Sequence, residues 1–326
     1  MADTISTQGQ VLGSAGRVRK VLFDQGIYVI LVILIVVATI LYPPFLGPDN
    51  VLLILEQNAP LGIVAVGMTI VLIGGGFDLS VGSTFALAGV LSAQFALAGN
   101  VVLGIVAGII AGAVCGLFNG FLVTVLRVNP FVATLGSMTL IQGGTLLYTN
   151  SQAFSVTDAS FAFIGSGKLG PVPVDVIIMV AIFALAQLVM RKTLYGRALF
   201  ATGGNPEASR LSGLRTKTIE ASTYVVAGVL AGFAGVISAS QLGTGQGTAG
   251  ATMALNAIAV VVIGGTALTG GEGSVLRSGV GLAILAVLQN IYYTLAVNTY
   301  FQLITQGAIV VGAVALDKRL RSRITR

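Results

Sequence analysis

Long uncharged stretches, separated by isolated charges, dominate the pattern of apolar and polar positions along the chain. A helix of about 20 apolar residues is long enough to cross the ~30 Å hydrocarbon core of a bilayer. The charges can therefore be read as boundaries between membrane passes, and they predict about ten transmembrane helices. These passes are expected at residues 25–48, 57–77, two within 79–126, 128–157, 176–190, two within 221–271 and two within 278–316.

The distribution of basic residues predicts how these passes are oriented. Short cytoplasmic loops of membrane proteins collect Lys and Arg. If the N-terminus is cytoplasmic and the passes number ten, all of the 17 Lys and Arg residues except Lys168 fall on the cytoplasmic side. We therefore expect both termini in the cytoplasm. The net charge of +6 is then a topology signal, and no nucleic-acid partner is expected because no basic soluble face is predicted.

Composition supports one integral membrane domain. Hydrophobic residues make up 55% of the 326 positions and charged residues 9%, which is more apolar surface than a soluble domain could hide. The expected fold class is an all-α polytopic membrane protein, multi-pass in the inner or plasma membrane of a bacterium. The first apolar run is too long for a cleaved signal peptide. The predicted organisation is a cytoplasmic tail at 1–21, a transmembrane domain at 22–317 with a cytoplasmic loop at about 191–217, and a basic cytoplasmic tail at 318–326.

Residue types that carry catalysis or bind metals are nearly missing. The sequence has one cysteine, Cys115, and no histidine, which excludes an intrachain disulfide and imidazole chemistry and argues against a metal site. An intramembrane enzyme would need a nucleophile with a base, and no Ser–Lys pair lies within one predicted pass. Residues 165–169 (GSGKL) resemble a phosphate loop but lack its first glycine and its Ser/Thr. We expect no cofactor, no enzymatic activity and no nucleotide site on this chain.

Glycines recur every four positions along the fourth predicted pass. In lipid, helices associate through close backbone approach, and small residues at this spacing permit it. The pattern predicts a central, closely packed helix; a sliding surface used in transport is the alternative interpretation. The stripe consists of Gly104, Gly108, Gly112, Gly116 and Gly120.

The cytoplasmic loop at 191–217 is basic and contains a predicted short helix at 206–211. Asn205 can cap this helix, Pro206 suits its first position, and Glu207 suits its positively polarised end. Such a segment is typical of a docking site for a cytoplasmic partner. A solvated loop that only sets the topology is the alternative.

Two glycine-rich breaks interrupt the apolar passes, at 74–76 before Asp78 and at 264–273. Backbone groups freed by such breaks must find partners around a cavity or an interface. The shared triplet at 73–75 and 263–265 indicates an internal repeat, as transporters often have. Asp78 can either line a path or cap the next helix. Uncharged polar groups and aromatics suit a neutral hydroxylated solute, although each could equally bond neighbouring helices; the candidates are Asp78, Ser80, Asn119, Asn129, Phe131 and Thr134.

Several short segments follow one another along the chain: 75–83 (GGFDLSVGS), 119–120 (NG), 129–136 (NPFVATLG), 193–197 (TLYGR), 203–208 (GGNPEA), 255–259 (LNAIA), 264–266 (GGT) and 270–273 (GGEG). In this order they resemble the permease subunit of the ribose/xylose/arabinose class of bacterial ABC importers, and the resemblance spans nearly the whole chain. Phe77 stands where that family usually has an aliphatic residue, and Asn256 where an acidic residue is common.

The resemblance implies a translocation path for a monosaccharide, a ribose-like pentose or a hexose, that works by alternating access. It implies three kinds of partner besides lipid: a cytoplasmic ABC ATPase, a periplasmic or lipid-anchored sugar-binding protein, and a second permease copy, identical or paralogous. It also implies that residues 196–208 couple the chain to the ATPase. The coupling residues would be Gly196, Arg197, Gly204, Asn205, Glu207 and Ala208.

An ion-coupled secondary carrier or a channel for a small neutral solute remains the alternative from another class. Such a protein would be expected to carry an acidic site deep in a helix. No acidic site of this kind and no pair of charges is evident at the middle of the predicted passes. We therefore expect an ATP-driven system whose ATP is hydrolysed by another chain.

Overall fold

The computed structural model describes the chain from residue 14 to residue 322, with side chains described at 25–309, 311 and 312. The outer parts of both expected cytoplasmic tails, 1–13 and 323–326, lie outside the described residues. The elements, in chain order, are α1 (Ser14–Leu41), the 3-10 helix η1 (Pro43–Leu46), α2 (Pro48–Ile73), α3 (Val81–Leu97), α4 (Val101–Thr124), α5 (Pro130–Thr149), β1 (Phe154–Ser155), α6 (Ala159–Ser166), β2 (Lys168–Leu169), β3 (Val172–Pro173), α7 (Val174–Lys192), α8 (Leu194–Gly204), α9 (Pro206–Leu211), α10 (Thr216–Leu242), β4 (Thr244–Gly245), α11 (Met253–Ile263), α12 (Val275–Thr294) and α13 (Thr299–Ser322).

Local sequence explains where many of these helices begin and end. Pro48, Pro130 and Pro206 stand at the first turn of α2, α5 and α9, where a missing N–H costs nothing. Helix α10 ends at Gly243, which adopts the left-handed conformation that glycine tolerates without strain. Asn150 adopts the same conformation after α5.

Helix α2 runs through the centre of the molecule and packs against α7, α10, α11 and α12. From Asn58 to Ile73 it is buried without interruption. The main apolar core gathers α2 residues such as Ile63 and Met68 with Ile237 of α10 and Val260 of α11. A helix buried on all sides has no amphipathic stripe, which is why its sequence reads as continuously apolar.

Helices α3, α4 and α10 form the most tightly packed group, and the glycine stripe of α4 lies within it. A β-carbon at Gly112 would collide with the backbone of Gly228, and one at Gly116 with the backbone of Tyr224. Gly104 and Gly108 lie against the backbone of α3, and Gly120 against Ala221 of α10. Backbone contact of this kind requires residues without a side chain.

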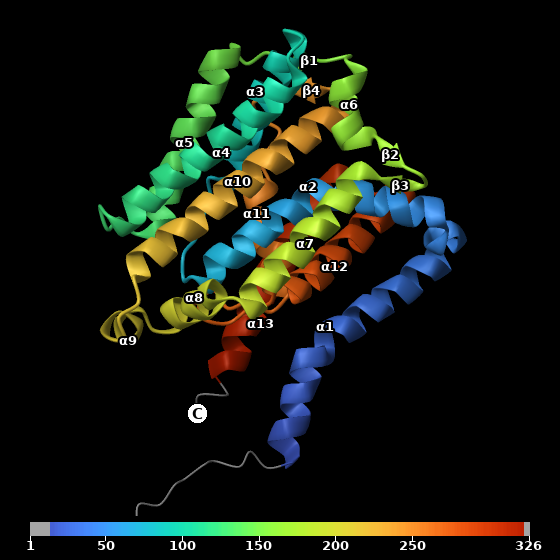
Figure 1. Ribbon diagram of the computed structural model, residues 1–326. Coiled ribbons are helices and arrows are strands. Elements are labelled where there is room, and N and C mark those ends of the chain that lie inside the picture. Colours follow the sequence, from blue (N-terminus) through green and yellow to red (C-terminus); the bar gives the residue numbers. More distant parts are fainter. Residues whose placement is uncertain (1–13, 323–326) are drawn as a thin grey trace, which may run out of the picture.

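The two ends of the helix bundle differ (Figure 1). Helices α8 and α9 lie at one end, together with the C-terminal end of α13 and the first turns of α1. The small antiparallel pairs β1–β4 and β2–β3, together with α6, lie at the other end. Phe154 is paired with Gly245 and Lys168 with Pro173. Lys168 is therefore far from the end that carries α8 and α9.

Each of the expected passes contains a helix, but their bounds differ from those that charge spacing gives. Asp49 and Glu56 were expected to separate two passes; this was wrong, because α2 begins at Pro48 and includes both. Five helices, α2, α4, α7, α10 and α12, are long and apolar enough to cross a membrane, and 25–41, α3 and α11 are shorter apolar helices. The molecule is an all-α polytopic membrane protein; the number of crossings and the domain bounds stay predictions.

Candidate functional site

Two non-helical segments meet inside the bundle. Residues 74–80 separate α2 from α3, and residues 246–252 lead from β4 to α11. The second segment touches the first turn of α3, where Gly82 meets Gly250, and a β-carbon on either residue would collide with the carbonyl group of the other. Helix α11 has 11 residues, about 16 Å at 1.5 Å per residue, which is about half the hydrocarbon thickness. Broken helices of this kind are tolerated where the freed backbone lies within protein or beside a cavity.

A closed polar cluster joins the first break to α4. The Asp78 carboxylate accepts hydrogen bonds from the backbone N–H of Ser80 at 2.9 Å and from the Ser80 hydroxyl at 2.7 Å. Asn119 donates from Nδ2 to Asp78 at 3.3 Å and to Ser80 Oγ at 2.6 Å. All three side chains are at most 1% exposed. Hydrogen bonds to a buried carboxylate offset part of the cost of removing it from water.

The cluster retains one unused acceptor. Oδ1 of Asn119 is buried and has no hydrogen-bond partner among the described residues. The N-cap residue of α3 is Ser80, whose own side chain makes no capping bond. Asp78 therefore supports the start of α3 through Ser80 and also contacts α4. The sequence left two roles open for Asp78, lining a path or supporting the start of α3. This geometry is compatible with both.

The other three candidate path residues lie apart from this cluster, at the start of α5. Asn129 caps α5 by accepting a bond from the Phe131 N–H at 3.0 Å. The Phe131 ring is 53% exposed, whereas Thr134 is buried and donates to the Pro130 carbonyl at 2.8 Å. The structure thus brings Asp78, Ser80 and Asn119 together and leaves Asn129, Phe131 and Thr134 as a separate group.

The expected coupling residues fall on α8 and α9. Asn205 caps α9 by accepting from the Ala208 N–H at 2.9 Å, as the sequence predicted for this short helix. Arg197, Gly204, Glu207 and Ala208 are exposed. Arg210 donates to Glu207 at 2.6 Å, and this bond and its positive charge lower the pKa of the Glu207 carboxyl. Helix α9 is therefore a short N-capped helix whose exposed residues are accessible to a partner.

Helix α8 is held in place by contacts with α7, α2 and α10. Gly196 is buried, and a β-carbon there would collide with the backbone of Met190 at the end of α7. Gly203 packs against the backbone of Ile73, the last residue of α2. The Tyr195 hydroxyl bonds Ser222 of α10 at 2.8 Å, and burial raises the Tyr195 pKa. A movement of α8 would therefore be transmitted to α2, α7 and α10.

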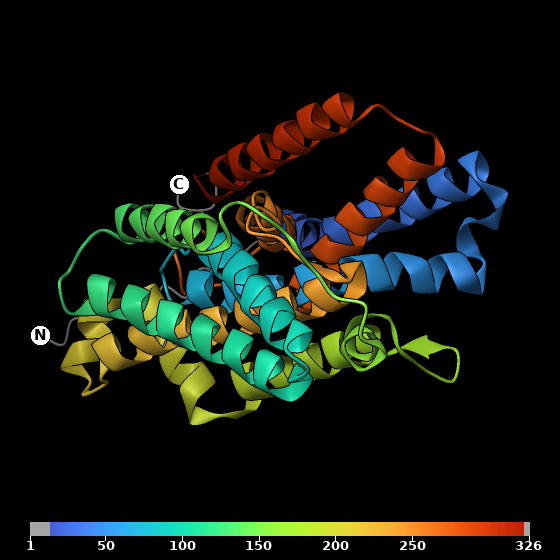
Figure 2. The ribbon, with the colours of Figure 1, turned by 90° about the horizontal axis from the view of Figure 1, so that it is seen from above.

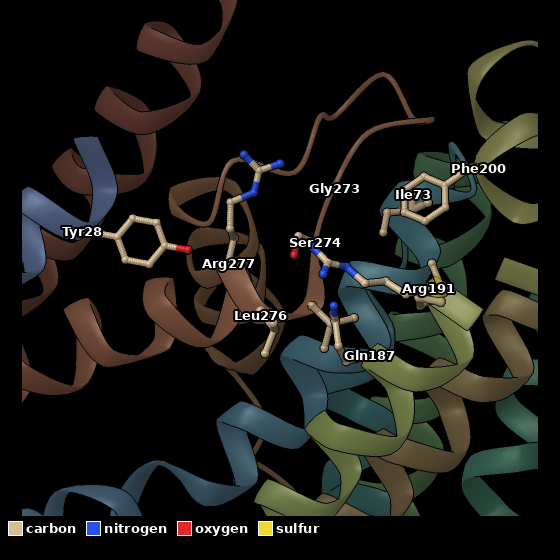
Figure 3. Close-up of a pocket in the computed structure, with 11 residues that line it drawn as sticks. Tyr28, Ile73, Gln187, Arg191, Phe200, Gly273, Ser274, Leu276 and Arg277 are labelled. Atoms are coloured by element: carbon tan, nitrogen blue, oxygen red, sulfur yellow. The ribbon is translucent and has the colours of Figure 1, made fainter. Parts of the chain in front are cut away.

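A pocket of about 360 Å³ lies beside α8, between α1, α7 and α12. Tyr28 faces it from α1, Arg277 from α12 and Arg191 from the end of α7 (Figure 3). Phe200 of α8 lines the same pocket. Arg191 and Arg277 thus place two guanidinium groups at the end of the molecule that carries α8 and α9.

A second pocket, of about 190 Å³, lies between α11, α12 and α13. Amide side chains line it from all three helices, namely Asn256, Gln289, Gln302 and Gln306. The three glutamines were not among the predicted site residues. Their signal was nevertheless present, because Gln289, Gln302 and Gln306 are amides within predicted membrane passes.

Comparisons with known proteins place the chain among permeases. The protein family described as the branched-chain amino acid transport system / permease component matches residues 50–314. A ribose import permease of Bacillus subtilis is 41% identical over 292 residues, covering 89% of this chain and 91% of its own. The ribose import permease of Haemophilus influenzae is 36% identical over 312 residues, covering 94% and 97% of the two chains.

A relative with a different named sugar also matches. An L-arabinose ABC transporter permease of Azospirillum brasilense is 32% identical over 309 residues, covering 94% of this chain and 91% of its own. No solved structure matches the chain.

Proposed function

The chain belongs to the permease family whose description names the branched-chain amino acid transport system, and from that premise we propose that it carries a ribose-like monosaccharide. It is the membrane-spanning subunit of an ATP-binding cassette sugar importer, and ATP is hydrolysed on a separate subunit. One observation carries the choice of ribose: relatives named as ribose importers match this chain over about nine-tenths of its length.

A branched-chain amino acid, which the family description mentions, is a weaker candidate substrate. Its ammonium and carboxylate would require charged or strongly polar partners. None of the described residues lining the 190 Å³ pocket is charged, and the Asp78 carboxylate already accepts hydrogen bonds from Ser80 and Asn119. A neutral, hydroxylated solute is the better match to amide and tyrosine side chains.

We further propose that the path runs through the contact between the two helix breaks. Asp78, Ser80 and Asn119 would line it where α3 begins, with Asn129, Phe131 and Thr134 at the start of α5. The unused acceptor of Asn119 supports this, because a buried amide oxygen without a partner can receive a solute hydroxyl. In the alternating-access mechanism that we propose, separation of Gly82 from Gly250 opens the path.

The cytoplasmic ATPase would act through α8 and α9. Its proposed contact consists of Gly196, Arg197, Gly204, Asn205, Glu207 and Ala208. The support is mechanical, since α8 packs on the ends of α2 and α7. A force on the exposed face of α9 would thus be transmitted through α8 to α2 and α7.

The remaining partners follow from the importer class. A substrate-binding protein delivers the sugar, and we propose that it is periplasmic or lipid-anchored and docks at the end carrying β1–β4 and β2–β3. We also propose a second permease copy. Helix α5 supports this, because a β-carbon added to Gly136, Gly143 or Gly144 would meet no atom within 4 Å, and Leu147 is 79% exposed. Lipid would cover the other exposed apolar faces.

Uptake of labelled ribose tests the proposed function. Cells that carry the chain should accumulate ribose, and cells in which it is deleted should lose most of this uptake and regain it on complementation. Depleting ATP should abolish uptake more strongly than a proton ionophore does. Collapse with the ionophore at normal ATP would instead favour the ion-coupled carrier.

A further inference from the structure

The 190 Å³ pocket between α11, α12 and α13 has the composition of a site for a polyhydroxylated solute. Four amides, Asn256, Gln289, Gln302 and Gln306, line it together with the rings of Tyr292 and Tyr293. An amide can both donate and accept hydrogen bonds, as a sugar hydroxyl can. Tyrosine adds a flat apolar face and a polar tip.

The position of the pocket suits a solute that enters from the side opposite α8 and α9. Gln302 and Gln306 lie about 5 and 10 Å along α13 from its start at Thr299, at 1.5 Å per residue. Gln289 and Tyr292 lie in the last turns of α12. Figure 2 shows α13 along one edge of the molecule, next to α11 and α12, which leaves the pocket at the margin of the bundle.

The polar groups are half-buried rather than fully paired within the core. Gln306 donates from Nε2 to Asn256 Oδ1, which links α13 to α11. The Tyr292 hydroxyl donates to Thr305 Oγ1 at 2.8 Å, and Gln302 donates to the Val297 carbonyl at 2.8 Å. No hydrogen bond from the Gln289 amide is described, and Asn256 and Gln306 both keep further donor or acceptor capacity.

This pocket is also joined to the contact between the helix breaks. Gly250, which touches Gly82, precedes Asn256 by six residues in the sequence. Asn256 lies in the first turn of α11, and Gly250 lies three residues before that helix begins. The two sites are therefore neighbours at the N-terminal end of α11.

We infer that Asn256, Gln289, Gln302 and Gln306 form the outer sugar-contacting site of the translocation path, a site for a neutral polyhydroxylated solute. The inference rests on the proposed function, which supplies the sugar. The simpler role for these amides is to hold α13 against α11, as polar residues do between membrane helices. The two roles give different results when the amides are replaced.

A double variant, Asn256→Leu with Gln306→Leu, separates them. Removing both partners of one hydrogen bond leaves no unpaired polar group between the two helices. The purified complex of chain, ATPase and binding protein, in proteoliposomes with labelled ribose, should keep its ATPase activity and lose uptake at least about tenfold, as expected when two or more solute hydrogen bonds are lost. Gln302→Leu should lower uptake in the same direction.

Tyr300→Leu provides the matched control, because Tyr300 is 75% exposed on α13 and does not line the pocket. Uptake by the double variant and by Gln302→Leu at the rate of this control would overturn the inference. Failure of the wild-type complex to import ribose would instead remove the proposed function. A variant complex that does not assemble is replaced by Gln289→Leu, whose amide holds no described bond to another helix.

Discussion

The backbones of Gly82 and Gly250 approach so closely that neither position has room for a β-carbon. This contact joins the start of α3 to the segment before α11, far apart in sequence. The contact is between backbones, because each carbonyl lies against the other glycine. A side chain at either position must push the start of α3 away from the segment before α11.

Replacement of Gly250 by alanine should therefore destabilise the protein. Overpacking of a tight site costs about 1–3 kcal/mol, and here the obstacle is backbone, which cannot rotate away. Thermal unfolding of the purified protein in detergent measures the loss. Gly26→Ala in α1 is the control, since nothing lies within 4 Å of its β-carbon position. Equal melting temperatures for the two variants would contradict the close contact.

The Asn119 amide should be needed for stability as well as for transport. Asn119→Ala removes the donor to Asp78 and Ser80 and leaves the buried carboxylate with fewer bonds, at a cost of about 1–3 kcal/mol. Asn119→Asp should be worse because it places two carboxylates side by side in a buried site. Melting temperatures of the two variants measure this order, with Asn100→Ala, an exposed amide at the other end of α4, as the control. A melting temperature of Asn119→Asp at the level of wild type would contradict the hydrogen-bonded cluster.

Extra bulk on α9 should uncouple the ATPase without unfolding the chain. Ala208 is exposed and bonds the Asn205 cap through its backbone N–H, so Ala208→Trp leaves that cap intact. We expect a several-fold loss of ATPase bound per permease in pull-down experiments, with membrane insertion unchanged. Leu169→Trp, in the hairpin at the opposite end, should bind the ATPase as wild type does. Normal binding and uptake by Ala208→Trp would remove α9 from the coupling surface.

The two ends of the molecule should be accessible from opposite sides of the membrane. The single native cysteine, Cys115, is buried, so the wild-type chain should remain unlabelled by an impermeant maleimide. Lys168→Cys should react when the reagent is outside intact spheroplasts, and Glu207→Cys only after the membrane is opened. Labelling of both positions from the same side would contradict the predicted topology.

The sequence predicted the helical class and the short helix at 206–211 because both depend on local signals. Uncharged runs mark helices in lipid, and Asn205 with Pro206 marks the start of a helix. The limits of α2 were missed because Asp49 lies in its first turn, where a carboxylate is compatible with the helix dipole, and because charge spacing alone does not show that Glu56 can lie within a helix.

The site was harder to predict because it depends on contacts between distant segments. Asp78 and Asn119 could be chosen as polar residues in apolar surroundings, but their hydrogen bond follows only from the packing of α3 against α4. Gln302 and Gln306 were overlooked for the same reason, since only the packing of α13 on α11 turns them toward Asn256. The sequence around Gly250 gave no indication that this residue contacts Gly82.

The central claim is that this permease works with an ATPase on another chain, and gentle purification from native membranes tests it most directly. Mass spectrometry should identify a Walker-motif ATPase that co-purifies with the chain in a constant ratio, and Ala208→Trp should reduce that ratio. A chain that is reproducibly isolated alone, while it remains intact and active in ribose uptake, would contradict the account and identify a self-sufficient carrier.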